Sequence, residues 1–203
     1  NIMKRILIAL AVLLAVQVAD AQTKSPEAAK KAVESAEAAS KDAKKATKVA
    51  TWLKLASSYM DAYNAPAGSA WLGASKQELQ LILAGEQPLS VEVVELNGMP
   101  YTKESFATRD YYYNQNGVLE IINVTKPIYE DALARALNAY AKANEVDAKQ
   151  AKLKDITAGI DNVRAKYTEE AYNCYQFGDL VKASVLFEKA AKAAATEPLL
   201  KVD

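Results

Sequence analysis

The chain has 203 residues and a mass of 22.0 kDa, enough for one domain with a hydrophobic core, and its 51% hydrophobic residues exclude global disorder. Lys plus Arg and Asp plus Glu number 25 each, so no net charge attracts nucleic acid or an anionic membrane. The sequence contains no His, and its seven Gly form no phosphate-binding pattern. We therefore expect a protein without catalytic residues, cofactor or metal ion, and not an enzyme.

The N-terminal residues have the pattern of a secretory signal peptide. A basic start at residues 3–5 precedes an apolar run at residues 6–16, and Ala19 and Ala21 have the spacing of a cleavage site. The apolar run is shorter than the roughly twenty residues that span a bilayer, so we expect cleavage and no transmembrane anchor. The sequence thus predicts that residues 1–21 are a signal peptide, starting at Met3, with upstream residues, and that the protein is exported and periplasmic or associated with the cell envelope. The residue directly after the cleavage site is Gln22 and not Cys, which argues against a lipoprotein.

Apolar residues at helical spacing predict most of the structure that follows. Ser25 and Pro26 are typical of a helix start, and alanines then recur every three or four residues as far as Ala50. This alanine seam fits close packing inside the domain or a tight surface for a partner. The predicted helices cover residues 26–39, 43–63, 76–84, 128–143, 144–177 and 180–195. A break in the fifth helix at Gly159 is left open.

The region between residues 66 and 125 changes from helical to extended periodicity. Pro66 and Gly68 end the second helix, because neither residue continues a helix well. Runs of β-branched and aromatic residues then alternate with tight-turn pairs at Asn97-Gly98 and Asn116-Gly117. The runs at residues 89–96, 108–113 and 118–124 predict a small antiparallel sheet of three or four strands.

Two stretches carry large aromatic residues beside small ones at the spacing of a tetratricopeptide repeat, in which small residues let two helices approach closely. The two sets are Trp52, Leu55, Ala56 and Tyr59, and Ala183, Phe187 and Ala190. Together with the signal peptide and the strand-bearing insertion, they resemble the N-terminal region of exported tetratricopeptide-repeat proteins of the Bacteroidetes type.

The resemblance implies a mainly α fold of tetratricopeptide-like helical hairpins, an α-solenoid, with the small antiparallel sheet inserted at about residues 66–125. Residues 22–203 would form this single helical domain. The second helix would pair with the helix at 128–143 to complete a repeat that the insertion divides. We also expect Ala183 and Phe187 to be buried between the helices of the last hairpin.

The resemblance further implies a non-catalytic scaffold whose groove binds a protein or peptide. The groove positions that it maps onto this sequence are Leu53, Ser57, Met60, Thr168, Tyr172, Tyr175 and Gln176. Packing of these side chains inside the fold is the alternative interpretation. A second hypothesis is a carbohydrate- or surface-ligand-binding protein that uses the inserted sheet. Its recognition residues would be Tyr111, Tyr112 and Tyr113, where alternate side chains of a strand face opposite sides.

The acidic residues that could serve as catalytic pairs do not converge in the sequence pattern. The three pairs are Glu169 with Glu170, Glu130 with Asp131, and Asp155 with Asp161. Adjacent helix positions point about 100° apart, so we interpret all three pairs as solvated helix faces. Cys174 is the only cysteine and cannot form an intramolecular disulfide. The oligomeric state does not follow from the sequence.

Overall fold

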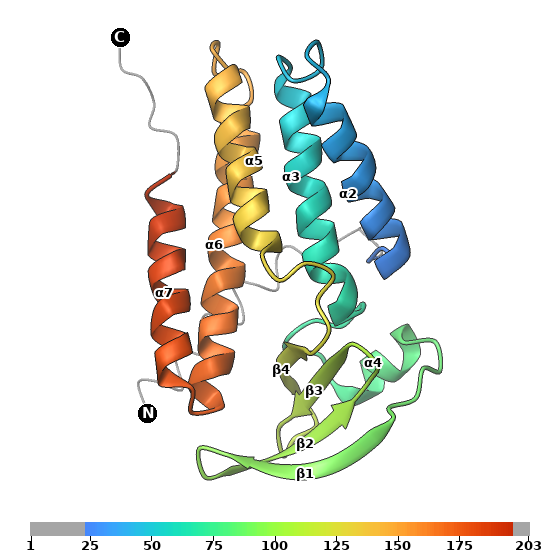
Figure 1. Cartoon of the computed structure of the whole chain (residues 1–203). Helices are drawn as coiled ribbons and strands as arrows, with labels where there is room; N and C mark the ends of the chain where they lie inside the picture. The colour runs from blue at the N-terminus through green and yellow to red at the C-terminus, as the bar shows by residue number, and fades with distance from the viewer. Residues whose placement is uncertain (1–22, 197–203) are drawn as a thin grey trace. The chain divides into compact units, whose positions relative to one another are not determined.

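The computed structural model describes residues 23–196, which form two compact units (Figure 1). A helical unit contains residues 24–65 and 128–196, and a sheet unit contains residues 66–127. The predicted signal peptide lies outside the described residues and stays a prediction. Over residues 23–196, no helix has the length and apolar character needed to cross a membrane.

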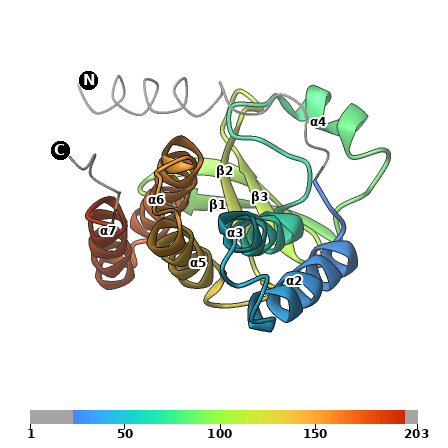
Figure 2. The ribbon, with the colours of Figure 1, turned by 90° about the horizontal axis from the view of Figure 1, so that it is seen from above.

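Five α-helices make up the helical unit, and each packs along the next (Figure 2). They are α2 (Pro26–Lys41), α3 (Val49–Asn64), α5 (Ala132–Val146), α6 (Leu153–Gln176) and α7 (Leu180–Ala194). A short 3-10 turn, η2 (Ala65–Ala67), follows α3. Although the whole sheet unit lies between α3 and α5 in the sequence, these two helices pack directly against each other.

Local capping explains where several helices begin and end. The Ser25 hydroxyl accepts a hydrogen bond from the Ala28 amide, and Pro26 occupies the first turn, so the predicted start of α2 is confirmed. The Asp42 carboxylate accepts hydrogen bonds from the amides of Lys44 and Lys45, which holds residues 42–47 in turns and delays α3. α3 therefore starts later than the sequence indicated.

One close contact decides the continuity of α6. This helix runs through Gly159 without a break, and the Tyr140 ring of α5 lies against the glycine where a Cβ atom would collide with it. The core around this contact is rich in alanine, which lets the helices approach closely. At its other end α6 stops before Gly178, whose φ of +78° suits a glycine that terminates a helix.

The sheet unit holds one helix and four antiparallel strands in the order β1-β2-β3-β4 (Figure 1). The elements are α4 (Lys76–Ile82), β1 (Ser90–Leu96), β2 (Met99–Ser105), β3 (Arg109–Tyr113) and β4 (Leu119–Val124). The predicted hairpin turn at Asn97-Gly98 is confirmed, with positive φ at both residues. α4 and the segment before it contribute Ala74 and Leu79 to a core under Tyr111 and Tyr113.

The prediction of a mainly α, solenoid-like fold is wrong. Six α-helices and a four-stranded antiparallel sheet make the described chain a mixed α/β protein. The physical reason is that the strand-rich region builds a unit with its own apolar core instead of a small addition to a helical array. The sequence pattern marked three of the four strands and missed β2, which has few of the β-branched and apolar residues that mark the others.

Candidate interaction surface

The exposed large hydrophobic side chains of the described residues fall into two segments of the chain. One is residues 81–99 of the sheet unit, and the other is residues 175–187 at the turn between α6 and α7. The second group comprises Tyr175, Phe177, Leu180, Val181, Val185 and Phe187. Contiguous exposed apolar surface is uncommon on soluble proteins and typically marks a binding site. The geometry of α7 shows which of these side chains share a face.

Two apolar stripes run along α7, and α6 covers one of them. The buried stripe follows a spacing of three, four and three residues, and its members are Ala183, Leu186, Ala190 and Ala193. A second stripe follows a spacing of four, three, four and three residues along an adjacent side of the helix. This "α7 stripe" consists of Leu180, Ser184, Phe187, Ala191 and Ala194. Its first four residues are exposed and the last is half-buried.

Aromatic side chains of α6 extend the α7 stripe sideways. Tyr172 meets Phe187 edge-on, with ring centroids 5.3 Å apart and an interplanar angle of 88°. Thr168, Tyr172 and Tyr175 are spaced by four and three residues, so they share one face of α6. We call these three residues together with the α7 stripe the "α6–α7 surface". Both helices belong to one hairpin, which holds the surface on rigid elements.

The residues predicted on α3 do not add to an exposed groove. Met60 is only 4% exposed, and Leu53 packs against the same core. Ser57 is half-buried and donates its hydroxyl hydrogen bond to the Lys54 carbonyl of its own helix. α3 lies between α2 and α5, and its neighbours cover much of its surface. Of the predicted α6 residues, Tyr175 is exposed, while Thr168, Tyr172 and Gln176 are half-buried.

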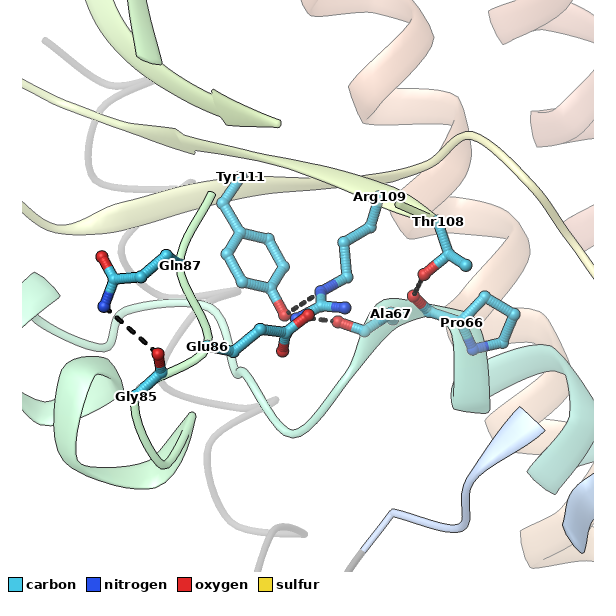
Figure 3. A network of polar contacts seen from close by, with 8 residues as sticks. All are labelled: Pro66, Ala67, Gly85, Glu86, Gln87, Thr108, Arg109 and Tyr111. Carbon is cyan, nitrogen blue, oxygen red and sulfur yellow. Dashed lines mark hydrogen bonds and ion pairs between the residues drawn. The ribbon is translucent and has the colours of Figure 1, made fainter. Parts of the chain in front are cut away.

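The three consecutive tyrosines of β3 are buried, each less than a tenth exposed. The Tyr111 hydroxyl donates to the Ala67 carbonyl and accepts from Arg109 Nε at 2.7 Å, while Arg109 Nη2 pairs with Glu86 at 2.7 Å (Figure 3). The Arg109 guanidinium also lies 4.5 Å from the centroid of the Phe106 ring. Burial raises the pKa of Tyr111.

This network holds Tyr111 in the interior of the sheet unit. It ties two loops to one strand, because the Thr108 hydroxyl also donates to the Pro66 carbonyl at 2.7 Å (Figure 3). Gly68 has a φ of +75°, and a Cβ atom there would lie 2.8 Å from the Tyr111 hydroxyl. The loop therefore closes over Tyr111 and leaves little of its ring open for stacking on a sugar.

The Glu170 carboxylate does not lie on a solvated helix face, although the sequence pattern predicted one. Glu170 accepts a hydrogen bond of 2.9 Å from the Tyr63 hydroxyl, which joins α6 to α3. Burial raises the pKa of Glu170, and burial together with the nearby Glu170 charge raises the pKa of Tyr63 well above its ordinary value. Solvated behaviour was therefore the wrong prediction for Glu170. In the sequence, the one indication of burial was that Glu170 lies one helical turn from the aromatic Tyr167. Only the packing of α3 against α6 identifies Tyr63 as its hydrogen-bond partner.

The other acidic pairs behave as ordinary surface charges. Glu169 forms an ion pair with Lys166 at 3.0 Å. Asp131, Asp155 and Asp161 each form an ion pair with a residue on or next to their own helix. These ion pairs are Asp131 with Arg135, Asp155 with Lys152, and Asp161 with Arg164. Cys174 is half-buried, and burial raises the pKa of its thiol, which disfavours a reactive thiolate. Over residues 23–196, no cluster of three or more Asp, Glu and Cys side chains is arranged to bind a metal ion.

Comparison with protein-family models, with curated proteins and with solved structures gives no match for this chain. The resemblance to exported tetratricopeptide-repeat proteins therefore stays a prediction from the residue pattern.

Proposed function

We propose that the chain is a non-catalytic interaction protein that binds an amphipathic helix of a partner protein on its α6–α7 surface. The observation that carries this proposal is the α7 stripe, a second and mainly apolar side, interrupted by Ser184, along a 15-residue helix. Leu180 is 59% exposed and Phe187 is 38% exposed. A helix that is apolar on two sides normally buries both of them.

The spacing of the α7 stripe favours a helical partner over an extended one. Side chains that repeat every three and four residues form a straight seam, into which the apolar residues of a second helix can insert. Alanines at positions 191 and 194 allow close approach at one end of the seam. The larger Leu180 and Phe187 provide most of the apolar area at the other end.

The experiment that tests the proposal compares two neighbouring residues of α7. Leu180→Lys places a charge in the α7 stripe, whereas Val181→Lys makes the same change about 100° around the helix. Val181 is 78% exposed, so neither substitution creates a buried charge. We would use the purified chain to capture a partner from envelope extract and then identify the contact peptide with a photo-crosslinker at position 180.

We expect Leu180→Lys to weaken capture by at least about tenfold, or roughly 1.4 kcal/mol, and Val181→Lys to leave it nearly unchanged. The peptide crosslinked from position 180 should have apolar residues at helical spacing. Equal capture by both variants, or a crosslinked peptide without helical periodicity, would contradict the proposal. Binding to a glycan array with no protein captured would favour the ligand-binding hypothesis instead.

A further inference from the structure

The exposed hydrophobic side chains of residues 81–99 lie around the outer strand of the sheet unit. β1 is the first strand in the sheet order, and no strand of the described chain pairs with its outer side. Val91 and Val93 are 56% and 76% exposed. Strands at sheet edges are usually shortened or carry Lys or Pro to prevent pairing with another chain. β1 has seven residues and neither of these residue types.

The register of the first hairpin shows which backbone groups point outward. In a two-residue hairpin, the residues that flank the turn exchange both of their backbone hydrogen bonds, and here these are Leu96 and Met99. Bonded and non-bonded pairs alternate along an antiparallel ladder. The amides and carbonyls of Val91, Val93 and Glu95 therefore point away from β2. Their side chains also share one face of the sheet.

We propose that β1 pairs antiparallel with β1 of a second copy of this chain, with the two-fold axis at Val93. In this register Val93 lies opposite Val93 of the second copy, and Val91 lies opposite Glu95 of the second copy in both directions. All three outward-pointing residues of each strand are then paired. Three pairs with two hydrogen bonds each give six hydrogen bonds. The two four-stranded sheets become one sheet of eight strands.

Charge favours this register over its neighbours, and the self-complementary pairing of the three outward residues fits a second copy as the occupant. No two carboxylates lie opposite each other, because Glu92 faces Val94 of the second copy and Glu95 faces Val91. Glu92 is also bound to Lys103 of its own sheet at 2.9 Å. A shift of two residues in either direction leaves only two outward pairs, and one of these shifts sets Glu92 opposite its own copy. The chain carries no net charge that would keep two copies apart.

The first test measures association with sedimentation velocity over a range of concentrations of the purified chain. We expect a monomer–dimer equilibrium. Val93→Lys should weaken it by about a hundredfold, because two like charges then meet at the two-fold axis. Val181→Lys is the matched control, since that residue has nearly the same exposure in the helical unit. Val181→Lys should leave dimerisation unchanged. The same variant also serves as the control for partner binding.

The second test uses single-cysteine variants in a Cys174→Ser background. Val93→Cys should form a disulfide-linked dimer on oxidation, because facing residues of a bonded pair have Cα atoms about 5.5 Å apart. Glu95→Cys lies on the same face but roughly 13 Å from its own copy, so it should remain unlinked. A chain that stays monomeric, a dimer unaffected by Val93→Lys, or equal crosslinking of both variants would overturn the proposal. Each result is independent of partner binding by the α6–α7 surface.

Discussion

Glu170 shows how burial changes the properties of a surface-type residue. Its carboxylate accepts from the Tyr63 hydroxyl, and burial raises its pKa above the ordinary value of 4.5. The hydrogen bond from Tyr63 opposes this rise in pKa, as do the charges of Lys182 and Lys189, whereas the charge of Glu169 adds to it. The folded state therefore keeps a proton on Glu170 over a pH range in which the unfolded chain has released it. Stability from this residue is lost as the pH rises through that range.

We expect Glu170→Gln to remove this loss, because the amide oxygen can still accept the Tyr63 hydrogen bond without carrying a charge. The variant should unfold at a higher temperature than the parent at pH 7 and at about the same temperature near pH 4, as measured by circular dichroism. Glu169→Gln is the matched control, and it should be slightly destabilising at pH 7 because it breaks the pair with Lys166. A constant difference between Glu170→Gln and the parent at all pH values would contradict the assignment.

Residue patterns in the sequence identified local features better than contacts between distant segments. Ser25 with Pro26 and Asn97 with Gly98 act through their own backbone, so α2 and the first hairpin turn were predictable. Glu170 and Gly159 depend on residues of other helices. The sequence gives no register between helices, and it could therefore not show that the Tyr140 ring lies on Gly159.

At the scale of the element, α7 shows why apolar periodicity alone could not orient a helix. The sequence places apolar residues on two sides of α7, and we expected Phe187 to be buried. That expectation is wrong, because α6 covers the stripe that contains Leu186 and leaves Phe187 38% exposed. The same ambiguity affected the candidate site. Tyr175 of α6 is exposed as a groove residue should be, whereas Met60 of α3 lies in the core.

Substitutions at two neighbouring positions test the orientation of α7. Leu186→Ala should destabilise the helical unit by about 2–5 kcal/mol, because it removes buried contacts and leaves a cavity. Phe187→Ala should cost less, about 1 kcal/mol, because 38% of the residue is already exposed, although its edge contact with Tyr172 is lost. Urea denaturation followed by circular dichroism measures both values. A larger loss for Phe187→Ala than for Leu186→Ala would show that α7 is rotated from the orientation described.

At the scale of the whole molecule, the two units have separate apolar cores. The core of the helical unit is formed by residues of α2, α3, α5, α6 and α7 and of the segments next to them. Both apolar clusters of the sheet unit contain only residues between Ala70 and Ile122. The proposed sites follow the same division, with partner binding on the helical unit and self-association through β1. Each activity should therefore be removable without the other.

The final prediction is that the helical unit folds without the sheet unit. Tyr63 and Ile128, near the two points where the chain leaves and re-enters the helical unit, both pack against the helical core. We would replace residues 66–127 with a short Gly/Ser linker and record circular dichroism, thermal unfolding and sedimentation. The helical signal and cooperative unfolding should persist, because the linker closes a chain whose ends the core already holds, and loop closure depends weakly on length. Capture of a helical partner should also persist, while dimerisation should disappear with β1. Loss of cooperative unfolding would show that the sheet unit is required to fold α3 and α5 together.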